Sequence, residues 1–129
     1  MSSASDYLEN KLLDHTLRNA AFTQPAGLYL ALYTVLEDDA GGGTELPVAN
    51  GYARQSVTMG NAAGGVASNT NTITFTAAGG NWGTIVRTAI FDAVSGGNLL
   101  THSALTPNRI INDTDQLKLD PGDLDVSID

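Results

Sequence analysis

The chain has 129 residues, enough for one domain spanning residues 1–129 and too few for a second independent core. Hydrophobic residues make up 42% and charged residues 16%, a balance that predicts a folded chain and argues against a disordered one. Fourteen acidic against six basic residues give a net charge of -8, which disfavours nucleic acid as a partner, and the absence of cysteine removes disulfides, thiol catalysis and thiolate metal sites.

We also expect no membrane partner. No stretch reaches the roughly 18 consecutive apolar residues of a membrane span. Residues 1–9 are polar and acidic, where a signal peptide would be basic and then apolar. The sequence therefore predicts assembly in the cytoplasm.

The first predicted element is an amphipathic helix over residues 5–22. Its leucines recur at helical spacing: Leu8, Leu12, Leu13 and Leu17. Ser5 or Asp6 is expected to cap its start, and acidic residues in the first turn suit the helix dipole. Because the opposite side is charged, we expect this helix to lie on one side of a sheet or against a neighbouring subunit.

A β-strand is predicted next, over residues 28–35, where leucines alternate with Tyr29, Ala31 and Tyr33. Both of its faces are apolar, so the strand is expected to be central in a sheet or to have its far face covered by the helix or another chain. Residues 36–51, with a triple glycine and several acids, are predicted to form a long loop used for contacts.

The rest of the chain is a series of short predicted strands separated by glycine-rich turns. They span residues 52–59, 71–76, 84–91, 99–103, 109–111, 116–119 and 124–128. The residues expected to point inward are Ile73, Phe75, Val86, Ile90, Leu124, Val126 and Ile128. Strands at this spacing with no helix between them predict a mainly β fold: an antiparallel, jelly-roll-like β-sandwich over residues 28–128, preceded by the helix.

Catalysis is not expected. His15 falls among the charged residues of the predicted helix. A triad of Ser103, His102 and Asp92 can be drawn, but neighbours in a strand point to opposite faces, and no nucleophile elbow is present. We therefore predict a protein that is not an enzyme and has no catalytic residues.

Six aspartates near the C-terminus raise the possibility of a calcium site. They are Asp113, Asp115, Asp120, Asp123, Asp125 and Asp129. The spacing lacks the glycine and the closing glutamate of a calcium-binding loop, so turn formation and edge protection are the favoured interpretation. No glycine pair is followed by lysine and Ser or Thr, which excludes a phosphate loop. We predict no metal and no cofactor.

Aromatic residues allow a second binding hypothesis, a sugar-stacking platform. Its members would be Trp82, Tyr29, Tyr33 and Tyr52. A lone tryptophan at the start of a strand is more often an anchor in the core or at an interface, so a carbohydrate-binding module stays a minor alternative.

Six segments, taken in order, resemble a group of small virion structural proteins of tailed bacteriophages. They are SDYLENKLLDHTLRN, LYLALYT, GYARQSVTMG, SNTNTITF, NWGTIVRTAIFDAVSGGNLL and GDLDVSID, and the likeness covers nearly all of residues 5–129. Members of this group are commonly labelled tail-fibre or minor structural proteins. The resemblance implies a structural component of the virion and assigns a chemical role to no residue.

A capsid cement protein, which would bind the capsid and its own copies, is the first functional hypothesis, because a shell needs many copies of a small unit. A subunit of the tail fibre, collar or tail tip is the second. The expected partners are other virion proteins, namely the major capsid protein or tail proteins, and further copies of the chain as a homo-oligomer. The candidate interface residues are Leu8, Leu12, Tyr29, Tyr33, Gly41, Gly42, Gly43 and Trp82.

Overall fold

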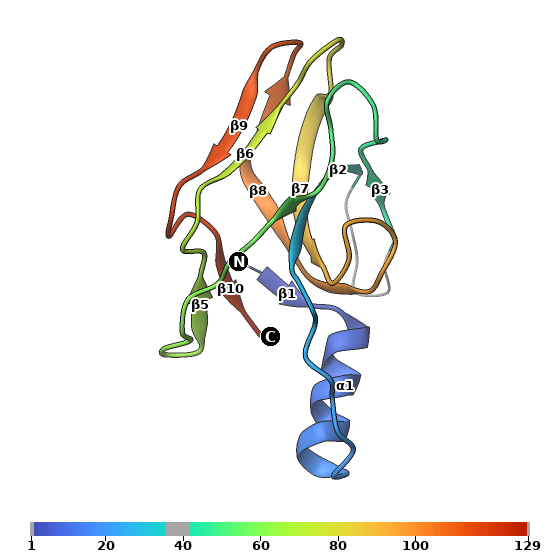
Figure 1. Ribbon diagram of the computed structural model, residues 1–129, viewed down its shortest axis with the longest axis vertical. Helices are drawn as coiled ribbons and strands as arrows, with labels where there is room; N and C mark the ends of the chain where they lie inside the picture. The colour runs from blue at the N-terminus through green and yellow to red at the C-terminus, as the bar shows by residue number, and fades with distance from the viewer. Residues whose placement is uncertain (1, 36–41, 129) are drawn as a thin grey trace.

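The computed structural model describes residues 2–35 and 42–128, and Figure 1 shows one helix followed by a body of β-strands. In chain order the elements are β1 (Ser2–Ala4), α1 (Asp6–Leu17), β2 (Tyr29–Val35), β3 (Thr44–Glu45), β4 (Gln55–Ser56), β5 (Val66–Ser68), β6 (Ile73–Thr76), β7 (Gly83–Phe91), β8 (Leu99–Ile111), β9 (Gln116–Leu119) and β10 (Asp125–Ser127). The short strands β1, β3 and β5 were not predicted from the sequence.

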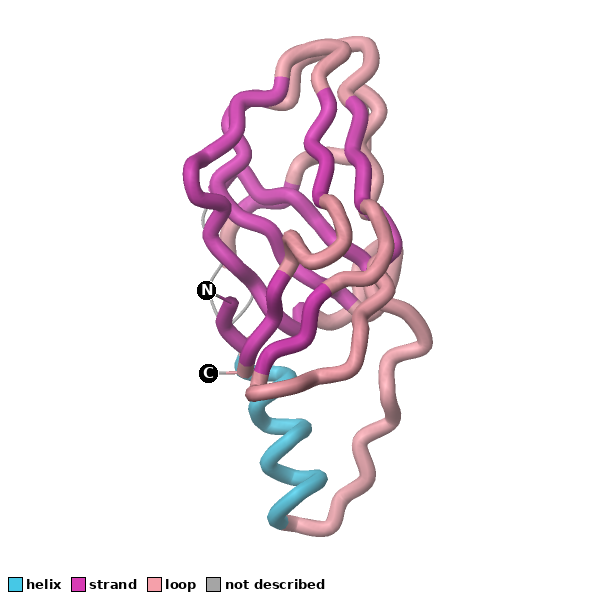
Figure 2. The backbone as a smooth tube through the Cα atoms, turned by 90° about the vertical axis from the view of Figure 1, so that its left-hand side faces the viewer, coloured by secondary structure: helices cyan, strands magenta, loops and turns pink. Residues whose placement is uncertain are grey.

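The strands form one main sheet and two small ones. The main sheet has the order β1-β8-β7-β2-β3, and β4 also pairs with β2. The pairs β6–β9 and β5–β10 lie against it as a second layer (Figures 1 and 2). Each of these pairs is antiparallel. The predicted mainly β, antiparallel fold with an N-terminal helix is confirmed and is consistent with a β-sandwich, while the jelly-roll connectivity stays a prediction.

The main core lies between the two layers. It contains Leu30 and Leu32 of β2, Ile85 and Ile90 of β7, and Phe75 of β6. The alternate residues of β2 belong to a smaller cluster, in which Ala31 and Tyr33 pack with Ala89, Phe91 and Leu99. Because successive residues of a strand point to opposite faces, this second cluster lies on the outer face of the main sheet. The prediction of a central strand with two apolar faces is therefore confirmed.

Strand β8 corrects the prediction of two separate strands over residues 99–103 and 109–111. Its pairing with β7 aligns Ala104 with Arg87 and Arg109 with Ile85, so four residues of β8 lie opposite Val86 alone. Proline cannot donate a ladder hydrogen bond, and Pro107 falls in this bulged stretch. The strand continues on both sides of it.

The same bulge changes which face of β7 enters the core. Ile85 is 0% exposed, while Val86, which was expected to point inward, is only partly buried. The prediction for Ile128 is also wrong, because this side chain is 53% exposed. The other expected inward residues are buried, or in the case of Val126 partly buried and packed against the core.

Helix α1 is shorter than predicted and projects from the β layers (Figures 1 and 2). Ser5 is the N-cap: its Oγ accepts from the Leu8 N–H at 3.2 Å, and its own N–H donates to the Leu100 carbonyl at 2.8 Å. The helix ends at Leu17, and Asn19 has a φ of 58°, a left-handed conformation that the helix cannot continue through. None of its residues is buried, and it packs against the core through Tyr7 and Leu8 of its first turn. The expected contact with a neighbouring subunit stays a prediction.

Candidate functional site

An ion pair of Arg54 and Glu45 lies on the outer side of the main sheet. The Arg54 Nε donates to Glu45 Oε2 at 2.9 Å, and its Nη2 donates to Oε1 at 2.8 Å. This two-point contact matches the planar guanidinium to the carboxylate. The Arg54 side chain is 8% exposed, so the pair is mostly removed from solvent.

Tyr52 extends this pair into the core. Its hydroxyl donates to Glu45 Oε2 at 2.6 Å and accepts from the Leu32 N–H at 3.1 Å, which connects the ion pair to the backbone of β2. Burial raises the pKa of Tyr52 far above its usual value, and the hydrogen bond to Glu45 raises it further, so the phenol stays neutral.

Arg54 also fixes the connection between β7 and β8, residues 92–98. Its Nη1 donates to the carbonyls of Ala93 at 2.9 Å and Gly96 at 2.8 Å, and its guanidinium lies 3.8 Å from the centroid of the Phe91 ring. The Phe91 ring stacks in turn on Tyr33, with centroids 6.4 Å apart and planes 5° from parallel.

Two further bonds close this connection. Asp92 accepts from the Asn98 N–H at 2.7 Å and from its side-chain amide at 3.0 Å. Burial alone would raise the pKa of Asp92, but the hydrogen bonds from Asn98 outweigh it and hold that pKa below its usual value. Gly97 has a φ of +76°, and a Cβ there would lie 2.5 Å from Asp92 Oδ1, so this turn requires glycine.

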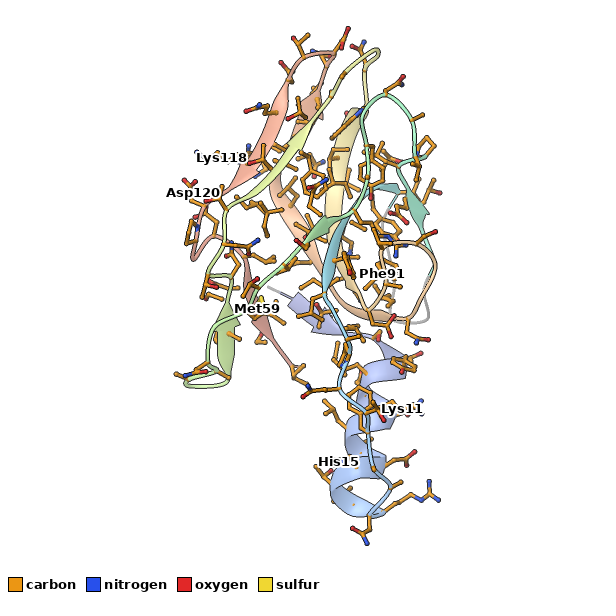
Figure 3. The ribbon with its side chains drawn as sticks, viewed as in Figure 1. Lys11, His15, Met59, Phe91, Lys118 and Asp120 are labelled. Carbon is orange, nitrogen blue, oxygen red and sulfur yellow. The ribbon has the colours of Figure 1, made fainter. Side chains whose placement is uncertain are left out.

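A cleft of about 500 Å³ opens beside this cluster, at the start of α1. Its walls come from the helix start, β2, β7 and the connection 92–98, and they include Asp6, Tyr7, Tyr33, Arg54, Phe91 and Asn98. Figure 3 places Phe91 at the end of the main sheet that faces the helix. The volume falls in the range of small-ligand sites.

An apolar groove lies at the same end of the molecule. It holds about 170 Å³, and its lining is apolar apart from Thr101; it includes Leu8, Leu28, Met59, Ile90, Val126 and Ile128. Figure 3 shows Met59 close to β10, away from the side of the sheet that carries Phe91. The groove and the cleft are therefore distinct features.

The helix carries two leucine stripes where the sequence predicted one. At about 100° per residue, Leu8 and Leu12 share one side, while Leu13 lies about 140° and Leu17 about 180° away from Leu8. Leu8 packs against the core, whereas Leu13 is 54% and Leu17 is 77% exposed. The second stripe therefore faces solvent.

The predicted interface residues are distributed over several surroundings. Leu8 lines the groove, Leu12 and Tyr29 are partly buried, and Tyr33 lines the cleft. Gly42 is partly buried and Gly43 exposed, while Gly41 lies outside the described residues. Their roles in an interface stay predictions.

Trp82 lies in the core. It is 7% exposed, its ring meets Tyr52 edge-on at 5.7 Å, and its indole N–H donates to the Asn50 carbonyl at 2.9 Å. Because Trp82 and Tyr52 are buried against each other, they present no flat platform to a sugar. The cleft residues Asp6, Tyr7 and Arg54 were missed, since only the folded chain brings them together.

The histidines are placed apart from each other. His15 Nδ1 accepts from the Phe22 N–H at 3.2 Å on the projecting helix, and Figure 3 shows this residue far from the sheets. His102 is 4% exposed in β8, between Ser3 of β1 and Ala89 of β7. Asp92, the third member of the hypothetical triad, is held by Asn98.

Four of the C-terminal aspartates organise turns or strand pairs. Asp113 accepts from the Gly79 N–H and Asp115 from the Asn112 N–H, both at 2.9 Å. Asp123 accepts from the Asp120 N–H at 2.8 Å, and Asp125 accepts from the Ser68 hydroxyl. These contacts support the turn interpretation. Across residues 2–35 and 42–128, no group of three His, Asp or Glu residues could hold a metal ion.

Two comparisons with known proteins complete this description. The family model described as "Podophage GP4 fiber I protein gp80" matches residues 3–127. No curated protein matches the chain.

In the described part of the chain, no helix is both long and apolar enough to cross a membrane.

Proposed function

The chain belongs to the family of Podophage GP4 fiber I protein gp80, and from this membership we propose that it is a non-enzymatic structural subunit of a phage tail fibre. The resemblance to small virion structural proteins is thereby confirmed, and a fibre protein is a component of the virion. The family description supports the tail-fibre alternative over capsid cement, which ranked first on the sequence alone.

The distribution of apolar surface supports this function. A fibre subunit must be attached at one end, and the helical end carries both the exposed leucines of α1 and, on another side of the helix, the apolar groove. A helix of 12 residues has little stability in water by itself, and α1 has no buried residue. The single observation that carries the proposal is the family match over residues 3–127, and this unburied helix with an exposed leucine stripe supports it.

The occupant that we propose for the helical end is a second copy of the chain. Residues 6–28 contain three acids and two bases, a net charge of -1 out of the -8 of the whole chain. Like-charged copies therefore repel each other least at this end. Several copies held at one place on a particle would reinforce weak contacts through high local concentration.

The copy number in the virion tests the placement. Purified particles, analysed by quantitative mass spectrometry against the major capsid protein as internal standard, should contain few copies of this chain, as tail symmetry requires. Labelled antibodies should bind at the tail in electron micrographs. A copy number close to that of the capsid protein would support cement and contradict a fibre.

The double variant Leu13→Gln/Leu17→Gln is expected to weaken self-association at least about tenfold. Each fully buried leucine contributes about 1.5–3 kcal/mol, and glutamine keeps the helix propensity and the charge. Sedimentation equilibrium of the purified chain over a concentration series measures the effect. Circular dichroism checks that the fold is retained.

A matched control is Ile110→Thr, which removes a side chain that is 67% exposed on β8. It should leave self-association unchanged. A wild-type chain that is monomeric at all concentrations, or a double variant that associates like the wild type, would contradict the proposed interface.

A further inference from the structure

The cleft at the start of α1 combines aromatic rings with hydrogen-bonding groups from separate parts of the chain. Tyr7 comes from the helix, Tyr33 from β2 and Phe91 from β7. Asp6 and Asn98 are exposed on its walls. The Asn98 amide nitrogen donates to Asp92, so the side-chain oxygens of Asp6 and Asn98 are the acceptors that these walls offer to a ligand.

The walls of the cleft are already held in position. Arg54 fixes the connection 92–98 through two carbonyls, and Asp92 closes that connection through Asn98. On the other side, the Tyr7 ring meets Phe22 edge-on at 6.5 Å, and the Lys11 ammonium lies 5.8 Å from its centroid. A preformed site loses less entropy when it binds a ligand.

We propose that this cleft binds a neutral saccharide. Sugar rings present apolar C–H faces that pack on aromatic side chains, and hydroxyls that donate to carboxylate and amide oxygens. Tyr7 supplies the partly exposed aromatic wall, and Asp6 and Asn98 supply the acceptor oxygens. The site differs from the platform expected on the sequence, of which only Tyr33 lines the cleft.

The charge around the cleft favours a neutral ligand over an anionic one. The chain carries a net charge of -8, and Asp6 adds a carboxylate at the rim. The guanidinium of Arg54 is the basic group at the cleft, and it already makes two bonds to Glu45 and two to backbone carbonyls. A polyanion would therefore be repelled at long range, and the guanidinium that lines the cleft is already bonded.

Saturation-transfer NMR with the full chain tests the proposal. The probes are the methyl glycosides of glucose, galactose, mannose, rhamnose and N-acetylglucosamine, with polygalacturonate and heparin as anionic probes. We expect at least one neutral glycoside to bind. Asp6→Asn should weaken that binding about tenfold or more, because the acceptor of the hydroxyl bond changes from a charged carboxylate to a neutral amide oxygen.

The control for this variant is Glu9→Gln, which removes the same charge from the same helical turn outside the cleft. It should bind like the wild type. A second pair compares Tyr7→Leu, which removes the aromatic wall, with Tyr29→Leu, which removes a partly buried tyrosine elsewhere. Only Tyr7→Leu should lose binding.

The proposal is overturned if none of the neutral glycosides binds, if the anionic probes bind in their place, or if Asp6→Asn and Tyr7→Leu both bind like the wild type. It does not depend on the fibre function. Sugar binding is tested on the isolated chain and copy number on the virion. A negative result in one test therefore does not contradict the other proposal.

Discussion

Replacing Arg54 with alanine is expected to lower the free energy of unfolding by about 3 kcal/mol, because one partner of a largely buried ion pair is removed. Among residues 2–35 and 42–128, the Tyr52 hydroxyl would remain as the side-chain partner of the Glu45 carboxylate. The carbonyls of Ala93 and Gly96 would also lose their donor. Urea unfolding followed by tryptophan fluorescence measures the change, since Trp82 reports on the core.

The geometry of the guanidinium makes this prediction specific. Lysine offers a single ammonium group, which cannot bond both carboxylate oxygens and two loop carbonyls at once, so Arg54→Lys should recover less than half of the loss. Arg87→Ala removes the same charge from a partly buried position of β7 and serves as the comparison. If Arg54→Lys is as stable as the wild type, the two-point contact contributes little and the interpretation of the cluster is wrong.

The double variant Arg54→Met/Glu45→Gln separates charge from packing. Replacing both partners of a buried pair with uncharged residues of similar size is often close to neutral. We therefore expect the double variant to be more stable than Arg54→Ala. Crosslinking or NMR of residues 92–98 would still show a looser connection, because two carbonyls remain without the arginine.

The elements that could be predicted from the sequence are those whose signal is local. Residues 116–119 were predicted with the bounds that β9 has, and Ser5 was one of two expected caps. The antiparallel fold followed from turn glycines and short alternating segments. In each case a few neighbouring residues decide the structure, so one sequence was enough.

The errors arise where a distant segment decides the structure. The alternation in residues 84–91 indicates the wrong face at Val86, because the pairing of β7 with the far part of β8 shifts the register there. Two separate strands were predicted over residues 99–103 and 109–111, but β8 continues through Pro107, which falls where the ladder is already interrupted. Neither effect leaves a signal within the strand itself.

The cleft was not predictable for a related reason. Arg54, Glu45 and Gly96 are brought together by long-range contacts, and a lone arginine in a strand-like segment has no motif. In the helix the residues themselves were recognised and their arrangement was not. The leucines were found from their spacing, but the spacing was not read as two stripes. Only the projection of α1 from the sheets made the second stripe visible.

Two variants, Ile85→Ala and Val86→Ala, are expected to show which side of β7 enters the core. Strict alternation along the strand places Val86 inside, whereas the structure places Ile85 inside. Ile85 is 0% exposed, and its replacement should cost about 2–5 kcal/mol of unfolding free energy, through lost burial and the cavity that remains. Val86 is partly exposed and stands in the bulge, so Val86→Ala should cost less than about 1 kcal/mol. Urea unfolding at constant pH measures both.

The comparison is internal, because the two residues are adjacent in one strand and both changes remove only β-branched apolar side chains. Strict alternation from Ile90 places Val86 inside and Ile85 outside, and it predicts the reverse order of costs. Between Ile85 and Arg87 the ladder shifts by three residues, and a shift by an odd number of residues exchanges the faces. A larger loss for Val86→Ala would therefore show that β7 and β8 pair without this shift. The explanation that Pro107 is accommodated in a bulge of β8 would then also be wrong.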